Sequence, residues 1–112
     1  MAKGAKGYWI NTAKITNPSL FSQYVEKVLP WLNSVDANVF AKDIEPVGKE
    51  TTEDANFAVI CEFPSKEAAI SAYESNEYKE ISKLREASTE NGTFTIMEGM
   101  SEAEKLKKAM GK

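Results

Sequence analysis

The middle of the chain holds a largely apolar run, Phe57–Phe63, in which Glu62 is the one charged residue and which Pro64 ends. Its branched and aromatic residues predict a β-strand. Side chains alternate between the two faces of a strand, so the odd-numbered residues share one face and Ala58 and Ile60 lie on the other. Both faces are therefore apolar, and both must be covered by other parts of the structure. This requirement restricts the chain to folds in which the sheet is packed on both sides.

A helix is predicted to follow a first strand at residues 7–13. Asn17 followed by Pro18 is typical of a helix start, because asparagine caps free backbone N–H groups and proline fits the first helical turn. Apolar residues then recur at spacings of three and four, as they do along one face of a helix. Pro30 interrupts this pattern, so the last turn is predicted to be either kinked or a separate short piece.

The same order of elements recurs in the second half of the chain. Ser65 is the predicted cap of a long helix that runs to about residue 87, with a second start signal at Ser75. Asn91-Gly92 is predicted to end this helical segment with a turn. The remaining predicted elements are a strand at 38–45, an exposed loop at 46–56, the apolar strand at 57–63, a strand at 93–98 and a short lysine-rich helix at 101–111.

This order predicts an α+β fold of the ferredoxin-like type, βαββαβ, with a four-stranded antiparallel sheet and both main helices on one face. A chain of 112 residues is long enough to bury one hydrophobic core. We therefore expect a single domain over residues 1–112. The ferredoxin-like core should cover about residues 6–99, followed by a helical extension at 100–112.

The helices of such a fold cover only one face of the sheet, which leaves the second apolar face open. A second copy of the chain, packed face to face, would cover it and form a dimeric α/β barrel. The short C-terminal helix is the alternative cover, but it offers few apolar residues. We therefore expect a homodimer.

Composition excludes several classes of function. The chain contains no histidine and one cysteine, which excludes a histidine-ligated metal or haem, a Ser-His-Asp triad and an internal disulfide. We expect no metal and no cofactor. The net charge of −3 argues against a nucleic-acid partner. No apolar stretch approaches the ~20 residues of a membrane span, and no signal-peptide core is present, so we expect a cytoplasmic protein without membrane contact.

Two single residues are candidates for a functional role. Arg85 is the only arginine among 14 basic residues, so its position favours a planar guanidinium that binds a carboxylate or stacks on a ring. The alternative is an exposed helical arginine paired with Glu86 or Glu77. Cys61 lies in the apolar strand with no histidine to deprotonate it, so we interpret it as a buried structural thiol.

Aromatic residues and one amide indicate a candidate pocket. Tyrosines and tryptophans from the first strand and both main helices are expected to meet between sheet and helices, where their polar atoms need partners. Asn11 lies mid-strand among them and would need several hydrogen-bond partners when buried. The candidate ligand-binding residues are Tyr8, Trp9, Asn11, Tyr24, Tyr73, Tyr78 and Arg85. Plain core packing is the alternative role of the aromatic residues.

The sequence also resembles a bacterial family, the domain of unknown function 1330. The resemblance is carried by Glu-Phe-Pro-Ser at 62–65, by Tyr-Glu-Ser-Asn-Glu-Tyr at 73–78 and by Lys-Gly-Tyr-Trp-Ile at 6–10, and it spans about residues 6–99. It implies a ferredoxin-like fold assembled as a dimeric α/β barrel. The family has no established reaction. The chain departs from the family at 41–44, where Ala-Lys-Asp-Ile replaces the usual arginine and paired glycines.

Two classes of function stay open at this point. The first is a binder of a small anionic or aromatic molecule between sheet and helices, or a cofactor-independent enzyme acting on one, with Arg85 on the anionic group. The resemblance extends to a superfamily that includes cofactor-independent monooxygenases, isomerases and haem enzymes, and the haem branch needs an axial histidine that this chain lacks. The second class is a non-catalytic structural, sensor or partner-binding dimer. No residue is identified as catalytic.

Overall fold

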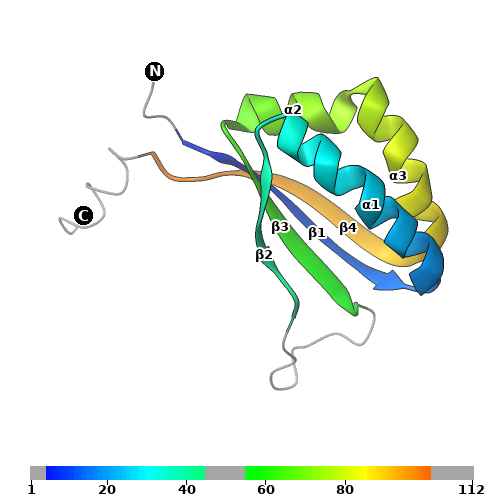
Figure 1. The fold of residues 1–112 in the computed structure, drawn as a ribbon. Coiled ribbons are helices and arrows are strands. Elements are labelled where there is room, and N and C mark those ends of the chain that lie inside the picture. Colours follow the sequence, from blue (N-terminus) through cyan, green and yellow to red (C-terminus); the bar gives the residue numbers. More distant parts are fainter. Residues whose placement is uncertain (1–4, 45–54, 102–112) are drawn as a thin grey trace.

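The computed structural model of the protein describes residues 5–44 and 55–101. Four strands form one antiparallel sheet in the order β2-β3-β1-β4, and the three helices all lie on one face of it (Figure 1). The elements are β1 (Gly7–Ile15), α1 (Pro18–Ser34), β2 (Asn38–Lys42), β3 (Phe57–Phe63), α2 (Lys66–Glu74), α3 (Asn76–Ser88) and β4 (Thr89–Glu98). This is the predicted ferredoxin-like fold. The helix predicted at 101–111 and the loop predicted at 46–56 fall almost entirely outside the described residues.

The three predicted helix starts are confirmed by their capping hydrogen bonds. Asn17 Oδ1 accepts from the backbone N–H of Leu20 at 3.1 Å at the start of α1. Ser65 Oγ accepts from Ala68 at 3.0 Å, and α2 begins there. Ser75 separates α2 from α3, and its hydroxyl accepts from the backbone N–H of the third residue of α3 at 3.2 Å. The long helical segment is therefore two helices, as the second start signal indicated.

The sequence left the end of α1 open, and it placed the ends of β1, β2 and β4 differently from the structure, in which β1 runs to Ile15. Pro30 lies inside α1, and the last turn through Ser34 belongs to the same helix rather than to a separate piece. The turn that follows Pro30 stays helical because its residue Leu32 is buried in the core. β2 ends at Lys42, three residues early, and the backbone leaves the strand at Asp43 with a φ of 70°.

β4 begins at Thr89, four residues before the predicted start. Asn91-Gly92 was interpreted as a turn that ends the helix, but Asn91 adopts a φ of 55° inside the strand. The strand register against β1 shifts between Thr12 and Lys14, opposite this point. The left-handed residue is thus part of an irregularity in the ladder, and the strand continues through it.

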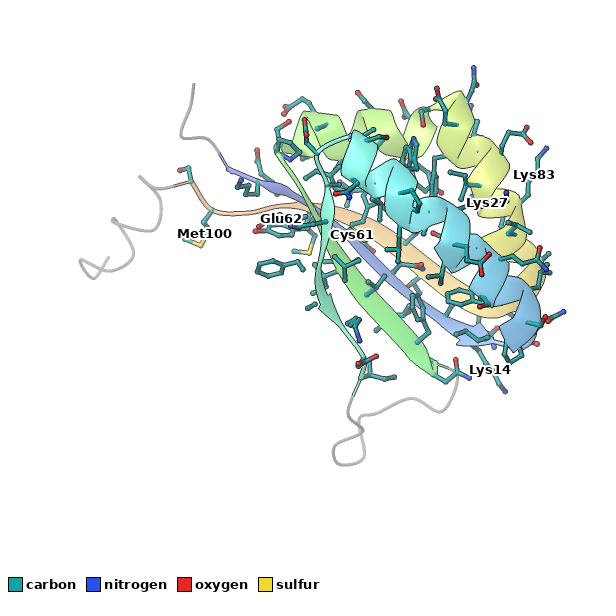
Figure 2. The ribbon with its side chains drawn as sticks, viewed as in Figure 1. Lys14, Lys27, Cys61, Glu62, Lys83 and Met100 are labelled. Carbon is teal, nitrogen blue, oxygen red and sulfur yellow. The ribbon has the colours of Figure 1, made fainter. Side chains whose placement is uncertain are left out.

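The two faces of the sheet have different environments. On the helix side, Trp9, Cys61 and Phe63 are buried in a core that α1, α2 and α3 complete. On the other side, Tyr8 and Ile10 are only partly buried, because no described helix covers them. The sheet is long, and Figure 2 labels Lys14 and Met100 near its two ends. None of the helices in the described residues is long and apolar enough to cross a membrane.

Candidate functional site

A cavity of about 690 Å³ lies between α1 and the helix-side face of the sheet. Its walls are mostly apolar and come from Val28 and Leu32 of α1, Val59 and Cys61 of β3, and Trp9 of β1. This volume falls within the range of about 300–1,000 Å³ that small-molecule sites occupy. A cavity therefore exists in the region where the sequence predicts a pocket, between the sheet and a helix.

The cavity exists because β2 covers the sheet edge poorly. β2 has five residues, all exposed, and its register against β3 shifts between Val39 and Ala41. Phe40 is the extra residue at this bulge, and its ring packs against Tyr8 on the opposite face, with a centroid distance of 5.6 Å. The ring of Phe40 thus packs against Tyr8 instead of filling the space under α1, although Phe40 still borders the cavity.

Asn11 is the buried amide of the cavity wall. Its Nδ2 donates to the backbone carbonyl of Thr93 at 2.7 Å and to that of Thr12 at 3.3 Å. These bonds satisfy the amino group, as expected for a side chain that is 3% exposed. Its Oδ1 accepts no hydrogen bond from the described part of the chain, so Asn11 presents an acceptor at the cavity.

Tyr24 begins a row of polar groups that leads away from the cavity. Its hydroxyl lies 2.8 Å from the hydroxyl of Tyr78, and the Nε of Arg85 donates to Tyr78 Oη at 3.2 Å. Burial raises the pKa of both tyrosine hydroxyls, so both hold their protons at neutral pH. Burial opposes the charge on Arg85, but the neighbouring tyrosine oxygens raise its pKa overall, so the guanidinium is charged.

Arg85 is buried, which contradicts the alternative of an exposed arginine paired with Glu86 or Glu77. Its guanidinium carbon lies 5.1 Å from the centroid of the Phe94 ring, and its Nε bonds a tyrosine rather than a carboxylate. A planar cation that stacks on a ring and donates sideways fits these contacts better than a lysine would. The unusual use of arginine at this position is thereby explained.

Arg85 also borders a second, more open hollow of about 390 Å³. This hollow lies where α3 meets the start of β4, and Tyr73, Glu86 and Glu90 line it as well. Phe94 lines both spaces and so forms part of the wall between them. The guanidinium is therefore adjacent to the cavity region but does not line the cavity itself.

Cys61 is the thiol of the cavity wall and is labelled in Figure 2. It is buried, and burial raises the pKa of this thiol to about 11. At neutral pH the group is a protonated thiol rather than a nucleophilic thiolate. The interpretation of Cys61 as a structural residue is consistent with this environment. The described residues hold no cluster of three or more potential metal ligands.

The predicted site residues fall into three groups. Trp9, Asn11 and Tyr24 line the cavity, while Tyr73 and Arg85 line the second hollow. The remaining two are not cavity walls: Tyr78 joins the groups through its hydroxyl, and Tyr8 lies on the opposite face of the sheet, where it donates to Glu62 at 3.0 Å.

Tyr8 therefore does not lie between the sheet and the helices, where we expect the pocket residues to meet. Neighbouring residues of a strand alternate in direction, and Trp9 occupies the helix side. Sequence reasoning also missed Val39, Lys42 and Asp43 of the cavity rim, because the bulge that sets their direction has no local sequence signal. The departure from the family pattern at 41–44 was the nearest indication of this region.

The chain is similar to one described protein family and to several solved structures. A family described as Domain of unknown function (DUF1330) matches residues 6–100. No curated protein matches the sequence. A crystal structure of a protein of unknown function from Rhodopseudomonas palustris is similar, with a TM-score of 0.69 and 16% identity over 88% of this chain and 85% of that one.

Two further solved structures share the fold. A dimeric protein of unknown function and ferredoxin-like fold from Bacteroides fragilis has a TM-score of 0.56 and 16% identity, over 83% of this chain and 95% of that one. A nipsnap family protein with unknown function from Agrobacterium tumefaciens has a TM-score of 0.55 and 15% identity, over 87% and 90%. At these identities the likeness shows the fold alone, which is ferredoxin-like.

Proposed function

This chain belongs to the DUF1330 family, and we propose that it binds a small, largely apolar molecule in the cavity between α1 and the sheet. The observation that carries the proposal is the cavity itself, a space of about 690 Å³ with apolar walls. The cavity is partly open to solvent, since its rim includes the exposed Leu29 and Lys42, so a ligand can enter it. Apolar cavities of this size are typical of small-molecule sites.

The polar groups of the wall indicate the chemistry of the ligand. Asn11 and Tyr24 are two hydrogen-bonding residues in an otherwise apolar lining, which suits a molecule with an aromatic or aliphatic body and few polar atoms. At the rim, Lys42 Nζ pairs with Asp43 at 3.0 Å, so the two charges there offset each other. This arrangement favours a neutral ligand over an anionic one.

Binding is tested by thermal denaturation of the full chain with 1-tetralone, a neutral bicyclic ketone, and with 2-naphthoate, an anion of similar size. A ligand of the native state stabilises it by about 2.7 kcal/mol at 100 times its Kd, so the midpoint temperature should rise. We expect a larger rise with 1-tetralone than with 2-naphthoate. The anionic alternative is supported instead if 2-naphthoate gives the larger rise.

A pair of variants locates the binding site. Leu29 is a half-exposed residue of α1 that lines the cavity, and Ile70 is a similarly exposed residue of α2 that borders neither described hollow. Leu29→Trp should obstruct the cavity and abolish the temperature rise, whereas Ile70→Trp should leave it unchanged. If neither compound stabilises the wild-type protein, the cavity-binding proposal fails and the non-catalytic dimer becomes the better reading.

We also propose that the working unit is a homodimer formed through the helix-free face of the sheet. Phe40 and Met97 expose 60% and 52% of their surface. The polar groups of this face are largely bonded to one another, since Tyr8 donates to Glu62 and the hydroxyls of Thr12 and Thr93 lie 2.6 Å apart. A second copy could therefore cover the apolar residues without leaving many polar groups unpaired. The dimeric Bacteroides fragilis protein of similar fold supports this reading.

A further inference from the structure

Arg85, Tyr78 and Tyr24 form a row of hydrogen-bonded groups. The chemistry of Arg85 fixes the direction of the first bond. A guanidinium carries only donors, so Tyr78 Oη must accept from Arg85 Nε across their 3.2 Å contact. The two tyrosine hydroxyls then share one further hydrogen bond across 2.8 Å. Because burial keeps both hydroxyls protonated, two hydroxyl protons are available for this single bond.

One of those protons is therefore left without an acceptor inside the row. If Tyr24 donated to Tyr78, the proton of Tyr78 would have no acceptor, because the described residues offer Tyr78 Oη only Arg85 and Tyr24 as partners. Tyr78 is 1% exposed and lines neither hollow, so that unsatisfied donor would be fully buried. A buried donor without a partner costs about 1–3 kcal/mol.

The opposite direction avoids this cost. If Tyr78 donates to Tyr24, the proton left over is that of Tyr24, whose residue lines the cavity. Tyr24 is itself 6% exposed, and none of the described residues accepts its proton. The unpaired donor then belongs to a residue of the cavity wall, where a ligand can satisfy it.

We propose that Tyr24 presents its O–H as a hydrogen-bond donor to the cavity, and that the ligand carries an acceptor oxygen of the carbonyl type at this point. This inference rests on the proposed function and adds the polar chemistry of the ligand to it. Arg85 acts as a positioning residue, since it sets the direction of the row without lining the cavity. Asn11 offers the complementary acceptor elsewhere on the wall.

The test compares 1-tetralone with tetralin, the same bicyclic skeleton without the carbonyl oxygen. Affinities for the full chain are measured by tryptophan fluorescence, since Trp9 lines the cavity. Tyr24→Phe removes the donor and should weaken 1-tetralone about three- to tenfold, while tetralin changes by less than about twofold. Tyr8→Phe removes a hydroxyl on the opposite face of the sheet and should change neither affinity.

The infrared carbonyl band of bound 1-tetralone provides a readout that a purely structural effect would not move. The band should lie at lower frequency in wild-type protein than in Tyr24→Phe, because a hydrogen bond weakens the C=O bond. The same frequency in both proteins, or an equal loss of affinity for ketone and hydrocarbon, would overturn the inference while leaving cavity binding intact. Failure of both compounds to bind wild-type protein would overturn the proposed function and this inference with it.

Two variants of Arg85 test its positioning role. In Arg85→Gln, the amide oxygen can accept the proton of Tyr78, which allows Tyr24 to donate to Tyr78 and removes the donor from the cavity. Arg85→Lys keeps a residue that only donates. We expect Arg85→Gln to weaken 1-tetralone and raise its carbonyl frequency, and Arg85→Lys to preserve both. Tetralin binding by each variant shows that the cavity is still formed, and identical behaviour of the two variants toward 1-tetralone would contradict the role.

Discussion

The indole nitrogen of Trp9 donates a hydrogen bond of 2.8 Å to the backbone carbonyl of Ala69, sixty residues further along the chain. Both residues are buried, and the bond joins the central strand β1 to α2. The same indole packs against Phe63 and Tyr78, with ring centroids 4.7 and 4.8 Å away. Trp9 therefore holds the second helical segment on the sheet and forms part of the cavity wall.

Replacing Trp9 by phenylalanine should lower the free energy of unfolding by about 2 kcal/mol. The change removes the hydrogen bond to Ala69 and leaves unfilled volume in the core. Urea denaturation measures the loss. Trp31→Phe is the matched control, because Trp31 is only partly buried and its indole nitrogen has no acceptor among the described residues. Equal losses for the two variants would show that the Trp9 bond contributes nothing of its own.

Gly7→Ala should destabilise the protein by about 1–3 kcal/mol, because it forces a side chain into a closed space. A Cβ at Gly7 would lie 2.6 Å from the Cα of Lys66 and closer still to the carbonyl oxygen of Ser65, both at the start of α2. Backbone atoms cannot move aside as the end of a side chain can. Gly92→Ala is the control, since its Cβ would meet its nearest neighbours at ordinary contact distances of 3.5 and 3.7 Å. The midpoint temperature of thermal denaturation measures both losses. A larger loss for Gly92→Ala than for Gly7→Ala would contradict the steric explanation.

The features predicted correctly from sequence depend on local chemistry. Asn17, Ser65 and Ser75 each cap a helix through their own side chain, so the signal and the structure lie within three residues of each other. The ends of β2 and β4 were predicted less well. The chain leaves the sheet at Asp43 after β2, and it bends within the sheet at Asn91 in β4. Both residues adopt a positive φ, and a left-handed residue does not by itself show which of the two outcomes follows.

The candidate site was predictable in composition but only partly in arrangement. Alternation along β1 separates Tyr8 from Trp9, and applying it strictly would have excluded Tyr8 from the pocket. The special role of Arg85 was visible because the chain uses lysine at every other basic position. Its contacts with Tyr78 and Phe94 could not be predicted, because these residues meet Arg85 only after α3 packs on the sheet.

Stability should fall between pH 9 and pH 11 because of Cys61. Burial raises the pKa of this thiol from its ordinary value of 9.0 to about 11. Below pH 9 the folded and unfolded states both hold the proton, so the thiol has no effect on the pH dependence. Above pH 9 the unfolded chain loses the proton first, which favours unfolding by about 2 kcal/mol by pH 11.

The measurement for Cys61 is urea denaturation of wild-type protein and Cys61→Ala at pH 8 and pH 10.5. Lysines and tyrosines titrate in both proteins, so the difference between the two pH dependences isolates the thiol. Cys61→Ala should be the less stable protein at pH 8, because it leaves a small cavity, and should lose less stability on raising the pH. Parallel pH dependences would show that the thiol is not protected in the folded state.

A charge at the centre of the helix-free face should dissociate the proposed dimer. Ile10 lies on this face of β1, opposite Ile60 of β3, so Ile10→Glu would place a carboxylate where two copies are expected to meet. Light scattering coupled to size-exclusion chromatography should give twice the 12.4 kDa chain mass for wild-type protein and the single mass for Ile10→Glu. Ile70→Glu, on α2, should remain dimeric. A wild-type protein of single mass at micromolar concentration would rule out the dimer directly. A monomeric Ile70→Glu would instead place the interface on the helices.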